Sequence, residues 1–453
     1  MENVLSRKTK IIATIGPATM NKKIIADMLK EGVNAFRINF SHSNPEQASQ
    51  IVELIREAEK ETEKFVPIIG DLQGPTVRLG DFQPIQIKRD LEYTISKNEG
   101  IIIEEDEFYE LVSEGDTVIF DGGRFWAKVK EKKGSTVKVV FMTEGELGPR
   151  KTVAIQGKEY SFNAPTEKDA KDIEFAVKAG IEGIAISFIK KADDVLKVKD
   201  LARSSGDEVF TIAKIETISG VNNVDSILEA ADFILVARGD LGSHFPLEKI
   251  PEIQRYLIQK ALDHGKPSIV ATQLLESMIN NPIPTRAEVT DVYMAVSMGA
   301  DSLMVSGETA VGKYPLEVVR WLNVITSEAE KNLKFRARGK SLDVYDKFAE
   351  GVAMMSELID SKIVAVTTTG KTPQRLARFR PSKEIIGVCE DPFVFKKLQL
   401  VYGVIPFLTK SIKNEQVAVE DLKKSGLIKQ GEKIIVTRSL KQGVTDAIKI
   451  LEV

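Results

Sequence analysis

The sequence contains very little cysteine and histidine, which limits the redox and metal chemistry open to this protein. Cys389 is the only cysteine among 453 residues, so an internal disulfide and a cysteine-based metal site are excluded. A single thiol in a chain of this length fits a reducing compartment. The three histidines, at positions 42, 244 and 264, leave little room for a zinc centre.

Long hydrophobic runs and an excess of one charge are also missing. No segment approaches the ~18 uninterrupted apolar residues of a membrane span, and the N-terminal stretch MENVLSRKTK lacks the apolar core of a signal peptide. We therefore expect a cytoplasmic protein. The net charge is only -3 with both signs well mixed, so the composition indicates no surface for nucleic acid or membrane.

The sequence does contain a regular alternation of short apolar segments and amphipathic helical segments. The apolar segments span residues 11–16, 35–40, 66–72, 183–188, 209–216, 233–238, 268–273 and 302–307. Near-continuous hydrophobic strands that alternate with helices predict a parallel sheet covered on both sides. Eight such units are the number that closes a (β/α)8 TIM barrel, and a doubly wound open sheet is the competing topology.

Two regions interrupt this alternation, and the length of 453 residues predicts two or three domains at ~150 residues each. Residues 76–162 contain turn signals such as DGG and KKG between β-like segments, which predict an inserted all-β domain. Residues 334–453 begin a further α/β unit after the basic stretch KNLKFRARGKSLD. The barrel then comprises residues 1–75 and 163–333.

Polar residues follow the predicted barrel strands, where the active site of such a barrel lies. They are Arg37, Asn39, Ser41, Asp71, Ser187, Lys214, Glu216, Arg238, Gly239, Asp240, Thr272, Ser306 and Glu308. Lys214 and Glu216 are two residues apart in the stretch FTIAKIET and share one face of its strand. A buried ion pair is one interpretation, although it often stabilises no more than a hydrophobic pair would. With Asp240 nearby, Glu216 is better explained as a hard oxygen ligand for Mg²⁺.

Three stretches have features that suit phosphate binding. The backbone of RGDLG (238–242) follows a strand and could bind an anion, although a plain turn is an equal possibility. Arg37 and Arg78 could make charge-assisted contacts with a phosphate, although a solvated surface role is an equal possibility for Arg78 alone. The stretch TTTGKTPQRLARFRP from residue 367 could bind a phosphate through hydroxyls and amides, and a capped helix start is the alternative.

Motifs spread along the chain resemble those of one family. RKTKIIATIGPAT, FRINFSH, GDLQGPTVRLG, ISFIKKADDV, FTIAKIET, VARGDLG, ATQLLESM and SGETAVGKYP stand in the order and setting seen in pyruvate kinases. The resemblance covers nearly the whole chain and implies a barrel, an inserted β lid domain and a C-terminal α/β regulatory domain. It implies transfer of a phosphoryl group from phosphoenolpyruvate to ADP, the last step of glycolysis.

The resemblance also implies a role for each matching residue at the barrel. Glu216 and Asp240 correspond to ligands of Mg²⁺ or Mn²⁺, and Lys214 with Arg37 to the groups that stabilise the transferred phosphoryl. The amides of Gly239 and Asp240 correspond to the site of the substrate carboxylate. Thr272 lies near the carbon that gains a proton. The residues that correspond to supporting positions are Ser187, Ser306 and Glu308. Those that correspond to nucleotide-phosphate contacts are Arg78, His42, Asn39 and Lys158.

A monovalent-cation pocket is implied at four of these positions, with two departures. Its ligands correspond to Asn39, Ser41, Asp71 and the carbonyl of Leu72. Gln73 replaces the lysine of the family's DTKG motif. Thr76 replaces the glutamate that accompanies potassium dependence in many members. These departures speak against K⁺ activation, although the ligands could hold the ion.

The C-terminal loop resembles the family's binding loop for an effector phosphate, through residues Thr367, Thr368, Thr369, Gly370, Lys371 and Thr372. A sugar phosphate and a nucleotide monophosphate both fit it. Family members are commonly homotetramers, which is the expectation here. Two other classes of protein are the alternatives. An aldolase-like metal barrel would not need Lys214, Arg78 or a lid, and a non-catalytic sensor would not retain an intact barrel site.

Overall fold

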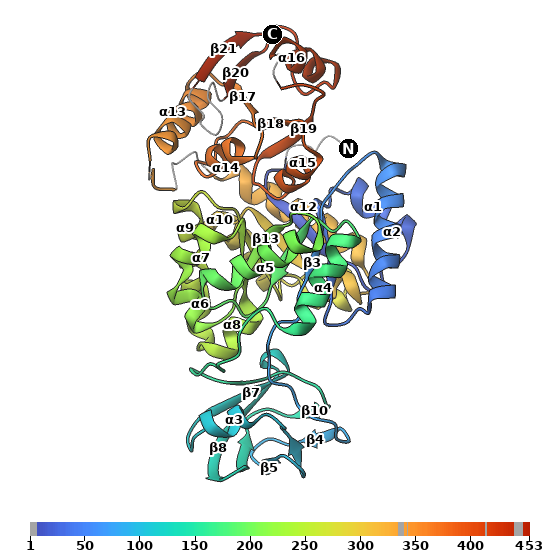
Figure 1. Ribbon diagram of the computed structural model, residues 1–453, viewed down its shortest axis with the longest axis vertical. Coiled ribbons are helices and arrows are strands. Elements are labelled where there is room, and N and C mark those ends of the chain that lie inside the picture. Colours follow the sequence, from blue (N-terminus) through green and yellow to red (C-terminus); the bar gives the residue numbers. More distant parts are fainter. Residues whose placement is uncertain (1–6, 334–338, 342, 413–414, 439–446) are drawn as a thin grey trace.

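A computed structural model describes residues 7–333, 339–341, 343–412, 415–438 and 447–453 of the chain. Three bodies are stacked along the long axis of the molecule, with the barrel in the middle (Figure 1). The inserted region lies at one end and the C-terminal region at the other. Residues 1–6 and the predicted start of the C-terminal domain at residue 334 lie outside the described residues.

Among the described residues, eight parallel strands close the central barrel in the order β1-β16-β15-β14-β13-β12-β3-β2. They are β1 (Lys10–Thr14), β2 (Ala35–Asn39), β3 (Ile68–Asp71), β12 (Gly183–Ile186), β13 (Phe210–Ile215), β14 (Phe233–Ala237), β15 (Ser268–Ala271) and β16 (Ser302–Val305). Each overlaps one predicted apolar segment, so the barrel prediction is confirmed and the open sheet is excluded. Their side chains are mostly buried because a packed interior and an outer helical layer cover both faces.

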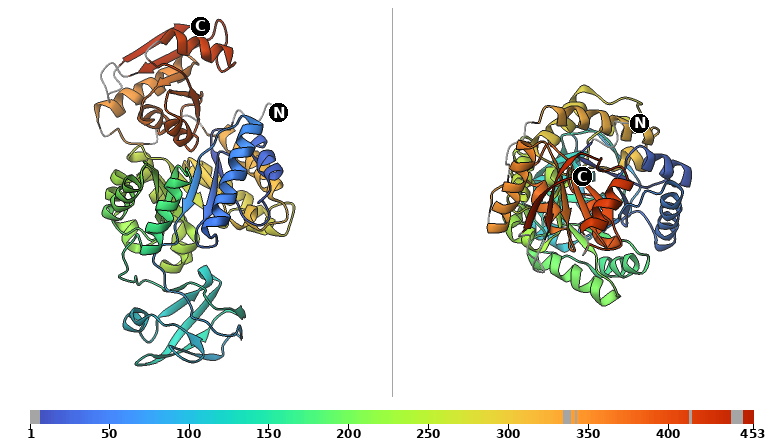
Figure 2. Two further views of the ribbon diagram at one scale, coloured as in Figure 1. Left: turned by 45° about the vertical axis from the view of Figure 1, so that its right-hand side comes forward. Right: turned by 90° about the horizontal axis from the view of Figure 1, so that it is seen from above.

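Helices surround the barrel, as the view from above in Figure 2 shows. The longer ones are α1 (Lys22–Lys30), α2 (Pro45–Thr62), α4 (Glu167–Lys178), α5 (Ala192–Ser205), α9 (Ile250–Asp263), α10 (Arg286–Met298) and α12 (Pro315–Lys331). Shorter helices are α6 (Ile218–Asn222) and α7 (Val224–Ala230) after β13, α8 (Arg238–His244) after β14 and α11 (Gly307–Ala310) after β16. In the described part of the chain, no helix is both long and apolar enough to cross a membrane.

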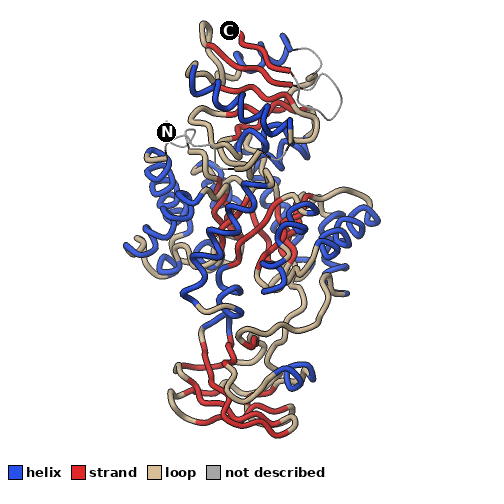
Figure 3. Tube along the Cα trace, turned by 90° about the vertical axis from the view of Figure 1, so that its left-hand side faces the viewer, coloured by secondary structure: helices blue, strands red, loops and turns tan. Residues whose placement is uncertain are grey.

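The inserted domain is built mainly of strands, with one helix beside them (Figure 3). Its strands are β4 (Ile85–Ile87), β5 (Glu92–Ser96), β6 (Ile101–Ile102), β7 (Thr117–Phe120), β8 (Phe125–Lys133), β9 (Thr136–Phe141), β10 (Gly145–Leu147) and β11 (Val153–Ile155). The expectation of an all-β insertion misses α3 (Asp106–Leu111). This helix forms because acidic residues occupy its first turn, while Phe108 and Tyr109 pack into the core of the domain.

The C-terminal region is a further α/β unit with sheet order β19-β18-β17-β20-β21. Its elements are α13 (Val344–Leu358), β17 (Lys362–Val366), α14 (Lys371–Ala377), β18 (Ile385–Cys389), α15 (Pro392–Leu398), β19 (Val404–Leu408), α16 (Glu415–Lys424), β20 (Lys433–Arg438) and β21 (Ala447–Glu452). The sequence predicted all the strands but β21. This antiparallel edge strand is largely exposed, so it lacks the buried apolar run that marked the others.

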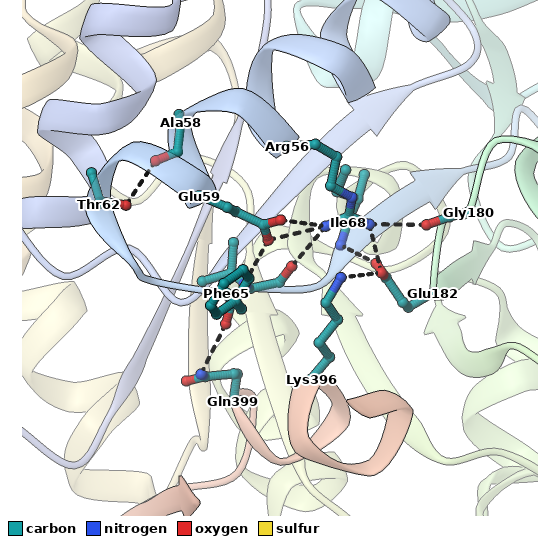
Figure 4. Close-up of polar contacts among 11 residues, drawn as sticks. Arg56, Ala58, Glu59, Thr62, Phe65, Ile68, Gly180, Glu182, Lys396 and Gln399 are labelled. Carbon is teal, nitrogen blue, oxygen red and sulfur yellow. Dashed lines mark hydrogen bonds and ion pairs between the residues drawn. The ribbon is translucent and has the colours of Figure 1, made fainter. Parts of the chain in front are cut away.

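The C-terminal region covers the amino end of the barrel. The two share one apolar cluster, in which Phe210 of β13 lies 5.4 Å from Phe233 and 6.1 Å from Phe393 of α15, between ring centroids. Polar contacts surround this cluster: Figure 4 shows Glu182 between Arg56 and Lys396, each 2.5 Å away. The carboxyl end of the barrel is thereby left to face the inserted domain.

Candidate active site

A polar cavity of about 260 Å³, here called the mouth cavity, opens between the carboxyl ends of the barrel strands and the inserted domain. It brings together many of the predicted residues: Arg37, Asn39, Ser41, His42, Asp71, Leu72, Arg78, Ser187, Lys214, Glu216 and Asp240. They come from distant parts of the sequence. They meet because the carboxyl ends of all parallel barrel strands lie on the same side.

Lys214, near the end of β13, contacts several groups of the mouth cavity. Its Nζ donates to Ser187 Oγ at 2.6 Å and lies 3.4 Å from Asp71 Oδ1 and 3.5 Å from Glu216 Oε2. Burial alone would lower the pKa of Lys214, but the carboxylates of Asp71, Glu216 and Asp240 outweigh it and raise this pKa. A permanent positive charge is therefore fixed in the mouth cavity.

Glu216 is fully buried directly after β13. The backbone N–H of Phe188 donates to its Oε1 at 2.6 Å, whereas its Oε2 has no hydrogen-bond partner among the described residues. Burial raises the pKa of Glu216, and Lys214 opposes this while Asp240 adds to it. Glu216 Oε2 therefore accepts no hydrogen bond among the described residues and faces only the Lys214 ammonium at 3.5 Å, so it could also contact a cationic ligand.

Arg37 and Asp71 form a buried ion pair across β2 and β3. Arg37 Nε and Nη2 both lie 2.6 Å from Asp71 Oδ2, and Arg37 Nη1 donates to Thr14 Oγ1 at 3.1 Å. Burial alone would raise the pKa of Asp71, but Lys214 and Arg37 hold it below its ordinary value. Asp71 therefore stays ionised and forms ion pairs with both Arg37 and Lys214 in the mouth cavity.

Thr272 and α8 are held against each other beside Asp240. The N–H of Gly239 donates to Thr272 Oγ1 at 2.9 Å, and Arg238 Nη2 donates to Thr272 O at 2.5 Å. Asp291 in turn anchors Arg238 through an ion pair of 2.6 Å. Thr272 has φ of 70°, a strained conformation for a β-branched residue that is common at functional sites.

Glu308 connects the loops that follow β15 and β16. Its two carboxylate oxygens accept the backbone N–H groups of Leu275 at 3.2 Å and Ser306 at 2.8 Å. The side chain is buried and both oxygens are occupied. Glu308 therefore supports the loop of Ser306 rather than offering an open ligand position.

The inserted domain supplies one wall of the mouth cavity through Thr76, Arg78 and Thr152. Arg78 Nη1 donates to Arg150 O at 3.0 Å, while its buried Nε has no hydrogen-bond partner among the described residues. Burial lowers the pKa of His42 across the cavity, and Arg78 adds to this effect. A neutral imidazole and an arginine thus face each other at the domain boundary.

The side chains of Lys158 and Asn39 are both engaged by other groups of the protein. Lys158 Nζ donates to Leu111 O and Asp116 Oδ2, both at 2.7 Å, within the inserted domain. Asn39 Oδ1 accepts the N–H of Ser41 at 3.0 Å at the edge of the mouth cavity. The Lys158 ammonium is therefore engaged inside the inserted domain in this conformation.

Sequence reasoning missed a second cavity of about 430 Å³ beside the mouth cavity. The two cavities share Arg37, Asn39 and His42, and the second is also lined by Thr14, Gly16, Pro17, Met20, Gln47 and Ile51. Thr14 ends β1, so the strand-end rule could have identified it. Gln47 lies in the first turn of α2, where it completes the helix cap with Asn44, and no sequence signal marked it as a site residue.

The predicted phosphate loop of the C-terminal region lies over the barrel's amino end. Thr367 Oγ1 accepts the N–H of Gly370 at 2.9 Å, and Gly370 has φ of 81°, which favours glycine. Thr368, Thr369 and Lys371 line a cavity of about 540 Å³ that also includes His264 and Lys266 of the barrel, while Thr367 and Thr372 are buried. The loop therefore faces a cavity between two domains.

The chain is similar to proteins of one family over most of its length. Family models described as "Pyruvate kinase, barrel domain" and "Pyruvate kinase, alpha/beta domain" match residues 6–319 and 348–451. The pyruvate kinase of Geobacillus stearothermophilus is 36% identical over 99% of this chain and 80% of its own length. That of Thermotoga maritima is 35% identical over 99% and 100%.

A crystal structure of a pyruvate kinase from Cryptosporidium parvum superimposes with a TM-score of 0.91 at 31% identity. The superposition covers 100% of this chain and 97% of that one. Sequence and fold thus agree over the whole length. The chain belongs to the pyruvate kinase family.

Proposed function

We propose that the mouth cavity is the site at which this chain transfers a phosphoryl group from phosphoenolpyruvate to ADP, giving pyruvate and ATP. The observation that supports this best is the convergence of Lys214, Arg37 and three carboxylates in one cavity. Phosphoryl transfer depends mainly on positioning and on neutralising charge. The test is pyruvate formation from the two substrates with Mg²⁺; absence of ADP-dependent pyruvate would contradict the proposal.

Family members depend on a divalent metal, and Glu216 and Asp240 would hold Mg²⁺ or Mn²⁺ here. Glu216 Oε2 is buried, accepts no hydrogen bond among the described residues and lies 3.5 Å from Lys214 Nζ, which suits an oxygen that could also contact a cation. Mg²⁺ sites commonly use one or two carboxylates completed by substrate oxygens and water. Bound there, the ion would neutralise charge on the phosphoryl and enolate oxygens.

Lys214 and Arg37 would contact the phosphoryl group and offset its charge during transfer. Their own positions are fixed by Asp71, Ser187 and Thr14, so no rearrangement is needed when charge develops. Next to them, the substrate carboxylate would lie at the first turn of α8, against the backbone of Gly239 and Asp240.

Thr272 would act near the carbon that receives a proton. Its hydroxyl donates to Ala271 O at 2.7 Å and accepts from Gly239, so it lies next to the proposed carboxylate site. Ser306 and Glu308 would support this region from behind. The group that finally delivers the proton is left unassigned.

ADP would bind where the barrel and the inserted domain meet. His42, Arg78 and Asn39 would contact its phosphates, and the 430 Å³ cavity is large enough for the nucleoside. In this proposal residues 76–162 form a lid that excludes water when it closes over the barrel of residues 1–75 and 163–333. Residues 334–453 would form the regulatory domain.

Potassium is expected to have little effect on this enzyme. Asn39, Ser41, Asp71 and Leu72 line the mouth cavity together and supply oxygen ligands, so the position could hold a cation, with Lys214 Nζ already 3.4 Å from Asp71 Oδ1. Gln73 and Thr76 also line that cavity. Gln73 stands in place of the lysine of the family's DTKG motif, and Thr76 in place of the glutamate that accompanies potassium dependence in many members. Rates measured in K⁺ and in tetramethylammonium salts should agree within about threefold. A dependence of tenfold or more would contradict this expectation.

A phosphorylated effector is expected to bind the 540 Å³ cavity next to the loop of residues 367–372. A cavity of that size suits a sugar phosphate or a nucleotide monophosphate, and Lys371 and Lys266 supply positive charge. Glucose 6-phosphate and AMP are suitable probes of the two classes. We expect one of them to lower KM for phosphoenolpyruvate several-fold, and Lys371→Ala to abolish this response.

The exposed Lys347 of α13 lies outside the cavity lining, so Lys347→Ala serves as the control and should respond as the wild type does. A wild type whose KM for phosphoenolpyruvate does not change with either probe, or a Lys371→Ala variant that still responds, would contradict the effector proposal.

We also propose that this chain forms a homotetramer, the common assembly of the family. Sedimentation equilibrium tests this directly.

A further inference from the structure

The segment that returns the chain from the inserted domain to the barrel, here called the return connector (residues 157–162), is fastened to the barrel at several points. It contacts the loops that follow β12, β13 and β14. These loops also contain Ser187, Glu216 and Asp240, which line the mouth cavity. The return connector therefore touches the same barrel loops that build the proposed metal site.

Glu159 makes the contact with the loop after β13. Its Oε1 accepts the backbone N–H of Ser219 at 2.8 Å, and its Oε2 accepts the Ser219 hydroxyl at 2.5 Å. Ser219 lies in α6, whose first residue follows the cap residue Thr217. Thr217 Oγ1 accepts the N–H of Gly220 at 2.9 Å and donates to Ile189 O at 2.9 Å. Glu159 is thus bonded through two charge-assisted contacts to a rigid part of the barrel.

Lys190 and His244 fasten the return connector on either side of Glu159. Lys190 Nζ donates to Tyr160 O and, at 3.0 Å, to Phe162 O. On α8, the carbonyl of His244 accepts the N–H of Gly157 at 3.0 Å, and His244 Nδ1 lies 3.2 Å from Lys158 O. These are contacts to backbone atoms of the connector. Glu159 is the connector side chain that reaches back to the barrel.

We propose that Glu159 is a positioning residue of the reaction, which holds the inserted domain over the mouth so that its nucleotide-facing groups stay in place. A wide outward swing of that domain must stretch the return connector and break both bonds to Ser219. Arg78 and Thr152 then leave the mouth cavity. The proposal rests on the proposed function, in which ADP contacts the inserted domain while phosphoenolpyruvate contacts barrel groups.

The test is Glu159→Ala with separate measurement of both substrates. KM for ADP is expected to rise about tenfold because two charge-assisted bonds that favour the closed position are lost. KM for phosphoenolpyruvate should stay within about twofold of the wild type, since its contacts are on the barrel. The affinity for Mn²⁺ without nucleotide can be measured from the loss of the EPR signal of the free ion. This affinity should be unchanged because Glu216 and Asp240 remain in place.

Three variants separate this role from general damage. Glu107→Ala is a matched control, since Glu107 accepts the N–H of Ser161 on the same connector but lies within the inserted domain; it should leave KM for ADP unchanged. Glu159→Gln retains an acceptor for the Ser219 N–H and should restore most of the affinity. Ser219→Ala combined with Glu159→Ala should be no worse than Glu159→Ala alone, because Glu159→Ala already removes the bond made by the Ser219 hydroxyl.

Hydrogen exchange gives a readout that does not depend on catalysis. Amides of residues 157–162 should exchange faster in Glu159→Ala than in the wild type or in Glu107→Ala. The positioning role is refuted if that exchange is unchanged or if KM for ADP stays within about twofold. It is also refuted if Mn²⁺ affinity falls as much as ADP affinity, which would assign the effect to the Glu216 loop. A wild type that forms no pyruvate would instead contradict the proposed function and leave the exchange result standing.

Discussion

Replacing Lys214 with methionine is expected to lower kcat for pyruvate formation by about 10³-fold, which corresponds to ~4 kcal/mol of lost transition-state stabilisation. Methionine fills nearly the same volume but removes the ammonium, which lies within 3.5 Å of both Asp71 and Glu216. Without this ammonium, the carboxylates of Asp71, Glu216 and Asp240 would repel the negatively charged phosphoryl group in the mouth cavity. Steady-state pyruvate formation measures the loss, and circular dichroism checks that the barrel remains folded.

Lys10 provides a matched control for the removal of a buried ammonium. It starts β1 at the opposite end of the barrel, where its Nζ donates to Val404 O at 2.7 Å. Burial lowers the pKa of Lys10 to about 7, so its ammonium group loses the proton far more readily than that of an ordinary lysine. Lys10→Met should keep kcat within about threefold of the wild type. Near wild-type turnover of Lys214→Met, or an equal loss in Lys10→Met, would overturn the role assigned to Lys214.

Replacing Glu216 with glutamine is expected to weaken Mn²⁺ binding at least about 10²-fold and to lower kcat/KM by a similar or larger factor. Glutamine keeps the shape and can still accept the N–H of Phe188, but it removes the charge that a divalent ion needs. The change also leaves Lys214 with one carboxylate fewer. EPR titration of free Mn²⁺ measures binding, and added EDTA should abolish wild-type turnover.

Glu308 is the comparison residue for this experiment. It is also a buried carboxylate at the barrel's carboxyl end, but both its oxygens already accept backbone N–H groups. Glu308→Gln should therefore leave Mn²⁺ affinity within about threefold, even if loss of the Ser306 contact slows turnover. Unchanged Mn²⁺ affinity in Glu216→Gln, or an equal loss in Glu308→Gln, would contradict the metal assignment.

Much of the fold was predictable because the barrel signal is local. Each strand is a short, nearly continuous apolar segment, and the count of such segments alone favoured closure. The two elements that the sequence did not predict, α3 and β21, are ones in which only some side chains are buried. Helix α3 has few residues and lies within a β-rich stretch, and β21 is an exposed edge strand whose pairing with β20 is set by distant residues.

Much of the mouth cavity was predictable for the same reason, since one rule about strand ends places Arg37, Asp71, Lys214 and Glu216 together. That rule says nothing about a residue such as Gln47, which starts a helix and reaches a cavity only because α2 packs beside β1 and β2. It also says nothing about Glu159, whose partner Ser219 is 60 residues away in sequence.

The sequence by itself determined the residue types, the barrel and the family, because apolar periodicity and motif order are properties of the chain read along its length. Only the tertiary structure decided how the charges are paired. Asp71 lies between Arg37 and Lys214, Glu216 keeps one oxygen that accepts no hydrogen bond among the described residues, and Lys158 is engaged within the inserted domain. Charge pairing depends on distance and burial, and both arise only when separate strands and domains are packed together.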